Sequence, residues 1–144
     1  MKLNYTIKGE GSPILLLHPV GSAITFLEPL ADLLSQHYQV MSMDLPGHGQ
    51  SPHLSFDDEH LMSLDDFAKE VHENLQDAQF APCAVVGFSF GGMIAQSLAF
   101  LYPQDVSFLM PCACPCTLPE ASRLISAKRG TDAKLHGMTS VIQA

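Results

Sequence analysis

The chain has 144 residues and a mass of 15.6 kDa, the size of one ordinary domain. An apolar fraction of 47% and a charged fraction of 15% exclude intrinsic disorder, which needs low hydrophobicity and high charge. Seven basic residues against fifteen acidic ones argue against a nucleic-acid or anionic-membrane partner. No apolar run is long enough to span a membrane, and the first residues contain no apolar signal region, so we expect a cytoplasmic protein.

The first half of the chain alternates between short apolar runs and helical spacing. Residues 4–8 predict a strand, and the continuous apolar run 14–17 is typical of a strand covered on both faces. Apolar positions from 27 to 34 recur at helical spacing and predict a helix that ends near His37. Residues 39–43 predict the next strand.

A loop rich in Pro, Gly and Ser follows at 44–55, and the helical pattern then returns. Apolar residues from 64 to 78 follow the i, i+3, i+4, i+7 rule, with acidic and basic residues on the other face. Ser63 and Asp66 resemble a capping box in which Asp replaces the usual Glu or Gln. This is the best-defined predicted helix.

The last clear elements are a buried strand at 83–86, a largely apolar helix at 91–102 that Pro103 stops, and a buried strand at 106–110. Alternating strands and helices predict an α/β fold with a mainly parallel sheet flanked by helices. Beyond Glu120 the helical spacing is short. Residues 1–120 hold three basic and fourteen acidic residues, and 121–144 hold four basic and one acidic, which suggests a second structural unit.

Three of the four cysteines, Cys112, Cys114 and Cys116, follow the last predicted strand. Alternate residues of a strand share a face, so these thiols could lie side by side. A zinc site would need a second ligand pair at fixed spacing, which the sequence lacks. We therefore expect small buried apolar residues, reduced thiols and no metal.

The segment 87–92, GFSFGG, places a serine between glycines where a strand turns into a helix. A G-x-S-x-G pentapeptide in this context is typical of a nucleophile elbow, which strains the serine backbone and exposes its hydroxyl. The following helix N-terminus favours developing negative charge. A serine in a simple glycine turn is the alternative. We predict Ser89 as a nucleophile and Phe88 as a substrate contact.

The segment 18–22, HPVGS, follows the first buried strand and so lies at the same sheet edge as Ser89. A loop here could aim the Val20 N–H at the oxygen that becomes anionic when Ser89 attacks, with the Phe90 N–H as second donor. His18 is tempting as a catalytic base, but we expect it to brace this loop and to lie at the substrate site.

The segment 44–51, DLPGHGQS, follows the second buried strand and predicts a turn. His48 within it is again a tempting base, yet a histidine in a glycine-rich turn is more often held by backbone hydrogen bonds. The three segments come in the order and spacing of the α/β-hydrolase superfamily, which residues 1–118 resemble. This resemblance implies Ser89 as nucleophile with the Val20 and Phe90 amides as oxyanion hole; Pro19 stands where the family usually has Gly.

The tail resembles, more weakly, the start of the helical cap in 3-oxoadipate enol-lactonase-like hydrolases. Residues 116–121, CTLPEA, lead into a helical pattern, and Gly137-Met138 resembles a later turn of that cap. The resemblance implies two parts: residues 1–118 as the N-terminal part of the hydrolase core and residues 119–144 as the beginning of a cap. Nothing in it implies a cofactor.

A serine hydrolase also needs a general base and an acid that orients it. The family order is Ser, then Asp or Glu, then His, and Asp132 with His136 meets that order only superficially, because both fall in the cap segment. We therefore expect a chain that stops before the last strands and that alone is inactive and prone to aggregate.

The predicted whole protein hydrolyses a small ester or lactone. The alternative is a non-catalytic relic or interaction module.

Overall fold

The computed structural model describes residues 1–52 and 62–115 and five later positions, 120, 124, 125, 128 and 131. The chain divides into two compact units, Met1–Cys114 and Pro115–Ala144. The architecture below is that of the first unit, and the predicted beginning of a cap falls mostly outside the described residues. Among the residues described, no helix has the length and hydropathy needed to cross a membrane.

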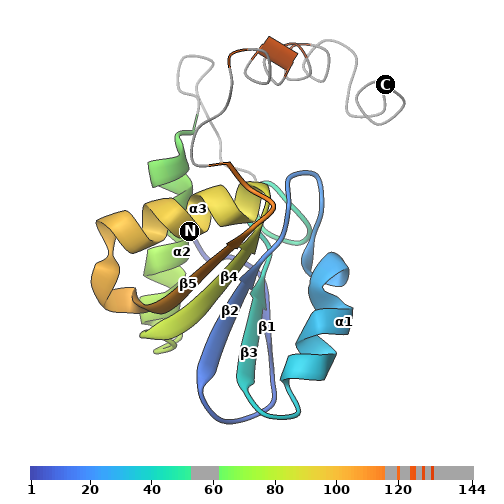
Figure 1. The fold of residues 1–144 in the computed structure, drawn as a ribbon, viewed down its shortest axis with the longest axis vertical. Helices are drawn as coiled ribbons and strands as arrows, with labels where there is room; N and C mark the ends of the chain where they lie inside the picture. Colours follow the sequence, from blue (N-terminus) through green and yellow to red (C-terminus); the bar gives the residue numbers. More distant parts are fainter. Residues whose placement is uncertain (53–61, 116–119, 121–123, 126–127, 129–130, 132–144) are drawn as a thin grey trace. The chain divides into compact units, whose positions relative to one another are not determined.

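Five strands form one sheet in the order β1-β3-β2-β4-β5 (Figure 1). Only β1 runs antiparallel to its neighbour β3, and the other pairs are parallel. The predicted mainly parallel α/β sheet is therefore confirmed. The strands are β1 (Tyr5–Lys8), β2 (Pro13–Leu17), β3 (Gln39–Met43), β4 (Cys83–Phe88) and β5 (Val106–Cys112).

The helices are α1 (Ile24–Leu34), α2 (Leu64–Asp77) and α3 (Phe90–Leu101), with a 3-10 turn η1 (Pro103–Asp105) before β5. The step from β2 to β3 runs across the sheet in one direction, and the steps to β4 and β5 run in the other. Because parallel crossovers are right-handed, this reversal puts α1 on one face and α2 and α3 on the other (Figure 1).

The predicted capping box of α2 is present. The Ser63 hydroxyl accepts a hydrogen bond from the Asp66 N–H at 3.2 Å, and the Asp66 carboxylate accepts one from the Ser63 N–H at 2.8 Å. Helix α1 begins three residues before the predicted start, at Ile24, after an Ala23 that has no side chain able to cap it. Its cap comes from elsewhere in the fold, as described below.

The sheet separates two apolar cores, and alternate residues of β2 enter each. Leu15 and Leu17 pack toward α2 and α3, where the larger core lies. Ile14 and Leu16 pack toward α1. All four are at least nine-tenths buried, so the prediction that β2 is covered on both faces is confirmed.

The prediction that β5 is a buried strand is wrong. Phe108 is 58% exposed and Met110 is 46% exposed. Helix α3 packs against β5, but α1 lies over β2 and β3 and does not reach β5 on the opposite face. An open apolar groove of about 710 Å³ remains on that face. It is lined by Ser12, Pro13, Ile14, Leu30, Leu34, Tyr38, Ala84, Val86, Phe88, Ser107, Phe108, Met110 and Cys112.

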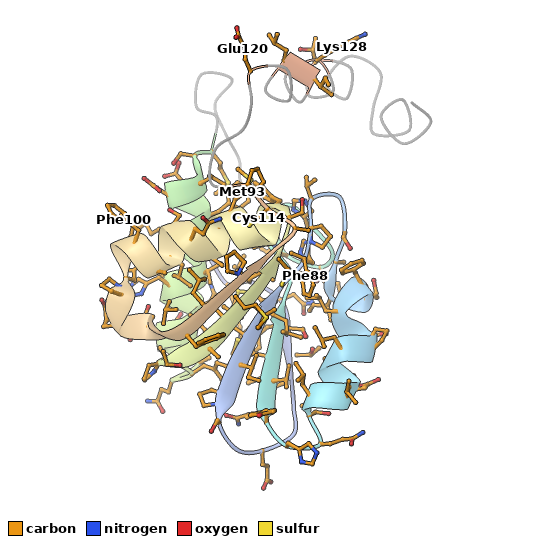
Figure 2. All side chains as sticks on the ribbon, in the orientation of Figure 1. Phe88, Met93, Phe100, Cys114, Glu120 and Lys128 are labelled. Carbon is orange, nitrogen blue, oxygen red and sulfur yellow. The ribbon has the colours of Figure 1, made fainter. Side chains whose placement is uncertain are left out.

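The cysteines after β5 also depart from expectation. The chain leaves the extended conformation at Ala113, where φ is 50°, so Cys112 and Cys114 do not continue one strand. Both thiols are half-buried rather than buried, and Cys114 lies beside the first turn of α3 (Figure 2). Cys116 lies outside the described residues.

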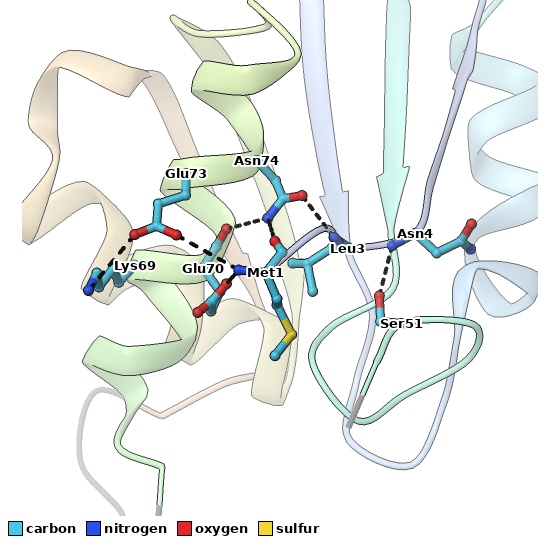
Figure 3. Close-up of polar contacts among 8 residues, drawn as sticks. All are labelled: Met1, Leu3, Asn4, Ser51, Lys69, Glu70, Glu73 and Asn74. Carbon is cyan, nitrogen blue, oxygen red and sulfur yellow. Dashed lines mark hydrogen bonds and ion pairs between the residues drawn. The ribbon is translucent and has the colours of Figure 1, made fainter. Parts of the chain in front are cut away.

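The N-terminal residues are tied to α2 (Figure 3). The Asn74 side chain accepts a hydrogen bond from the Leu3 N–H at 2.9 Å and donates one to the Met1 carbonyl at 2.8 Å. The Met1 ammonium pairs with Glu70 at 2.5 Å. These contacts place the segment before β1 on the side of the sheet that α2 covers.

Candidate active site

Ser89 stands at the turn between β4 and α3 as the N-terminal flanking residue of the helix. Its φ of 51° and ψ of −111° lie outside the regions that most residues with a side chain occupy. The residue is exposed, its N–H donates to the Cys112 carbonyl at 2.9 Å, and its carbonyl accepts from the Met93 N–H at 3.1 Å. Neighbouring elements therefore hold a strained backbone and leave the side chain open, which is typical of a functional site.

Two glycines make this turn possible because backbone lies where their side chains would be. A Cβ at Gly87 would come within 2.3 Å of the Gly91 carbonyl oxygen. A Cβ at Gly91 would come within 2.5 Å of the Leu17 oxygen and 2.6 Å of the His18 oxygen. The start of α3 thus packs directly against the end of β2, and the segment 18–23 begins beside the elbow.

That neighbouring segment is the predicted oxyanion loop, which connects β2 to α1. Val20 lies on its outer turn and is 66% exposed, and Gly21 follows with a φ of 69°. Phe90 is the first residue of α3, and the first N–H groups of a helix have no acceptor within it. The structure thus brings the loop and the helix start to one edge of the sheet. That the Val20 and Phe90 N–H groups form an oxyanion hole stays a prediction.

His18 is fully buried and both of its ring nitrogens are engaged. Nε2 accepts the Leu45 N–H at 3.0 Å, so the proton of the neutral ring lies on Nδ1, which donates to the Pro19 carbonyl at 2.8 Å. Burial lowers the pKa of the ring below its usual 6.5. This arrangement braces the loop and leaves no nitrogen for general-base work, and contact with a substrate stays a prediction.

His48 is held by its own turn, as predicted, with Nδ1 2.9 Å from the Pro46 carbonyl oxygen. Its ring lies 5.2 Å from the ring of His18 and 6.4 Å from that of Phe90. Phe67 of α2 meets Phe90 edge-on at 5.1 Å. The rings of His48 and Phe67 therefore pack against Phe90, the first residue of α3.

Phe88 occupies the other side of the elbow. It is half-buried, lines the apolar groove, and meets the exposed ring of Phe26 at 6.1 Å between ring centroids. The Phe26 and Phe88 rings therefore form an apolar contact between α1 and the end of β4. A substrate contact at Phe88 stays a prediction.

Within residues 1–52 and 62–115, no hydrogen bond joins the Ser89 side chain to a histidine. Asp105, one of the acids downstream of Ser89, lies at the opposite end of β5, where it accepts from His72 and Gln76. Asp132 and His136 lie outside the described residues. The described part of the chain therefore shows no histidine in hydrogen-bond contact with Ser89.

Sequence reasoning missed the role of Asp44. It is 2% exposed, and its carboxylate accepts hydrogen bonds from Asn4, Ile24 and Gln50. The only signal was its place at the head of the DLPGHGQS segment, which predicted a turn without saying what the turn encloses.

Comparison with known proteins shows the family of the chain. The sequence model of the alpha/beta hydrolase fold matches residues 13–139. The chain belongs to the α/β-hydrolase family. Aliivibrio fischeri (strain MJ11) pimeloyl-[acyl-carrier protein] methyl ester esterase is 36% identical over 117 residues. Acinetobacter baylyi (E)-2-((N-methylformamido)methylene)succinate hydrolase is 34% identical over 103 residues.

Those matches cover 79% and 72% of this chain but 41% and 38% of the two relatives. The chain thus spans about two fifths of the length of the curated relatives it matches. The enol-lactonase from Burkholderia xenovorans LB400 superposes with a TM-score of 0.87 at 22% identity, over 96% of this chain and 53% of that one. The solved structure shows the same fold.

Proposed function

We propose that the protein is a serine hydrolase of small carboxylic esters or lactones, with Ser89 as its nucleophile. The observation that carries this proposal is the exposed serine with φ at 51° between β4 and the N-terminus of α3. Membership of the α/β-hydrolase family supports it, since two relatives of at least 34% identity are themselves an esterase and a hydrolase. The enol-lactonase resemblance supports a lactone as one candidate substrate.

The chemistry follows from the positions of the groups. The Ser89 oxygen attacks the carbonyl carbon as its proton passes to a general base, and the Val20 and Phe90 N–H groups bind the resulting oxyanion. Collapse of the intermediate expels the alcohol, which takes the proton, and leaves an acyl-serine. Water then attacks in the same way and releases the acid. The base and its orienting acid come from outside the described residues.

The role of Ser89 can be tested by substitution in the protein as its gene encodes it. Ser89→Ala should abolish labelling by a fluorophosphonate and lower hydrolysis of a p-nitrophenyl ester by about 10⁶-fold in kcat, because the nucleophile is lost. Mass spectrometry of the labelled peptide and steady-state kinetics measure both effects. Ser107→Ala, which changes an exposed serine on β5, is the control and should react like the unaltered protein. Equal labelling of Ser89→Ala would refute the proposal.

The alternative is a non-catalytic member of the family that serves as an interaction module. The lack of a histidine hydrogen-bonded to Ser89 among the residues described favours it. The gene sequence after the Ala144 codon distinguishes the two. A continuing frame that encodes a strand followed by an acid, then a strand followed by His, supports the enzyme, and a stop codon supports the module.

A further inference from the structure

The DLPGHGQS segment encloses a buried carboxylate that the proposed chemistry does not use. Asp44 is 2% exposed, and its Oδ2 accepts hydrogen bonds from the Asn4 side chain at 2.8 Å and the Gln50 N–H at 2.9 Å. Its Oδ1 accepts from the Ile24 N–H at 2.8 Å. A buried anion is costly unless such donors surround it, so the segment is folded around this one group.

Gly49 shows how closely the turn wraps the carboxylate. A Cβ at this position would lie 2.2 Å from the Asp44 Oδ2 atom and 2.4 Å from Oδ1, and φ is 54°. Ser51 closes the turn from the other side. Its hydroxyl accepts the Asn4 N–H at 2.9 Å (Figure 3). The same hydroxyl donates to the Asp44 carbonyl at 2.6 Å. The glycine and serine of the motif are therefore explained by the carboxylate they enclose.

Through Ile24, Asp44 also acts at the start of α1. Ala23 precedes that helix and makes no side-chain hydrogen bond to it, and the first turn holds no acidic residue. The Asp44 carboxylate takes the place of a capping side chain from twenty residues away. A negative charge at this end of a helix is stabilising, because the helix dipole is positive there.

The oxyanion loop is thus fastened at both ends to one dipeptide. At its beginning the His18 ring accepts the Leu45 N–H, and at its end the Ile24 N–H donates to Asp44. Val20 lies between these two anchors and is itself exposed. The His18 carbonyl, in turn, lies against Gly91 at the start of α3.

We infer that Asp44 is a positioning residue, which sets the place of the Val20 N–H relative to Ser89 by anchoring the loop 18–23. The inference rests on the proposed function, because it assigns the anchored loop to the oxyanion. Asp44 touches neither substrate nor nucleophile, so its loss should weaken binding of the developing oxyanion and leave binding of the ground-state ester in place. This differs from a purely structural role, which would lower activity only through loss of folded protein.

The test is Asp44→Asn in the protein as its gene encodes it, because the amide keeps the shape but presents a donor where donors already converge. We expect a 10- to 100-fold lower kcat for a p-nitrophenyl ester, about the effect of a misplaced oxyanion donor, with KM changed by less than about threefold. Affinity for a trifluoromethyl ketone, which becomes an oxyanion when bound, should fall by the same factor as kcat. The backbone amides of residues 20–24 should exchange hydrogen faster than in the unaltered protein.

Asp32→Asn is the matched control. It makes the same chemical change on α1, at a carboxylate that is 64% exposed and pairs only with Lys8 among the described residues, and kcat should stay within about twofold. If Asp44→Asn does not fold, Gly49→Ala takes its place, since the added methyl displaces the carboxylate without removing its charge.

A folded Asp44→Asn or Gly49→Ala protein with unchanged kcat, inhibitor affinity and amide exchange would overturn the inference. Ser89→Ala separates this result from a failure of the proposed function. If Ser89→Ala stays active, the proposed function fails, and the hydrogen exchange of amides 20–24 still decides whether Asp44 holds the loop. If Ser89→Ala is inactive while the Asp44 variant matches the unaltered enzyme, only the positioning role fails.

Discussion

The His18 side chain gives the loop between β2 and α1 a dependence on pH. Burial is the main cause that lowers its pKa below 6.5, and the repulsion of nearby His48 acts in the same direction. Protonation would also remove the lone pair that accepts the Leu45 N–H. Protonation of His18 is therefore less favourable in the folded chain than in the unfolded chain.

We predict that this histidine lowers the stability of the protein in mild acid. Its contribution is fully present above pH 6.5 and is lost as the pH falls toward the pKa of the folded state, because the unfolded chain then binds more protons. The slope from one such group is at most about 1.4 kcal/mol per pH unit. In His18→Gln, whose Oε1 can replace Nε2 as acceptor, urea unfolding between pH 5 and 8 should show a smaller slope. Identical slopes in both proteins would contradict the prediction.

Individual residues differ in how far the sequence alone could place them. Ser89 was predictable because the glycines around it are required by contacts within a short span, between β4 and the start of α3. Asp44 was not, because its partners Asn4 and Ile24 lie forty and twenty residues away and only the tertiary fold brings them together. The long-range bonds of a turn residue leave no local pattern.

Between elements, a second buried carboxylate links α2 to the turn before β5. Asp105 is 1% exposed and accepts hydrogen bonds from His72 at 2.5 Å and from the Gln76 side chain at 2.8 Å. The His72 ring stacks on Tyr102 with 3.8 Å between centroids. Both donors lie on α2, so they fix the helix against η1 and the amino end of β5.

We predict that Gln76→Ala lowers the free energy of unfolding by about 1–3 kcal/mol, because one oxygen of a buried carboxylate loses its donor. Chemical denaturation followed by circular dichroism measures the change. Lys69→Ala on the same helix removes an exposed side chain in a surface pair with Glu73, and it should cost less than about 0.5 kcal/mol. Equal losses in the two variants would show that the Asp105 contact does not stabilise the fold.

The elements themselves were largely predictable, and their surroundings were less so. The predicted bounds of β3 are those of the structure, and the capping box located the start of α2. Strand β5 was wrongly expected to be buried. An apolar run indicates that a strand has apolar side chains on both faces, but it does not show whether other elements cover both faces. Coverage depends on where distant helices pack.

The molecule as a whole covers its sheet unevenly. Helices α2 and α3 pack on one face, whereas α1 covers only part of the other and leaves the groove beside β5. In the described part of the chain β5 is also the last strand of the sheet, with one side of its backbone unpaired. An apolar strand edge of this kind is a template for pairing with another chain.

We predict that the 144-residue chain on its own self-associates through β5. Met110→Lys should reduce that association, because a lysine on an edge strand opposes a second strand. Light scattering at increasing protein concentration measures it. Leu33→Lys adds the same charge at a 62% exposed position on α1 and should leave association unchanged. A monomeric unaltered chain with a cooperative melt would contradict the prediction.

The Met1 ammonium takes part in the fold of the described residues through its contact with Glu70. The hydrogen bond with Glu70 raises the pKa of the Met1 ammonium above 8.0, so the group stays charged at neutral pH. An acetyl group, a retained formyl group or a fused purification tag would abolish that charge and leave the half-buried Glu70 facing an amide. Any group joined to the Met1 nitrogen should therefore weaken the contact with Glu70.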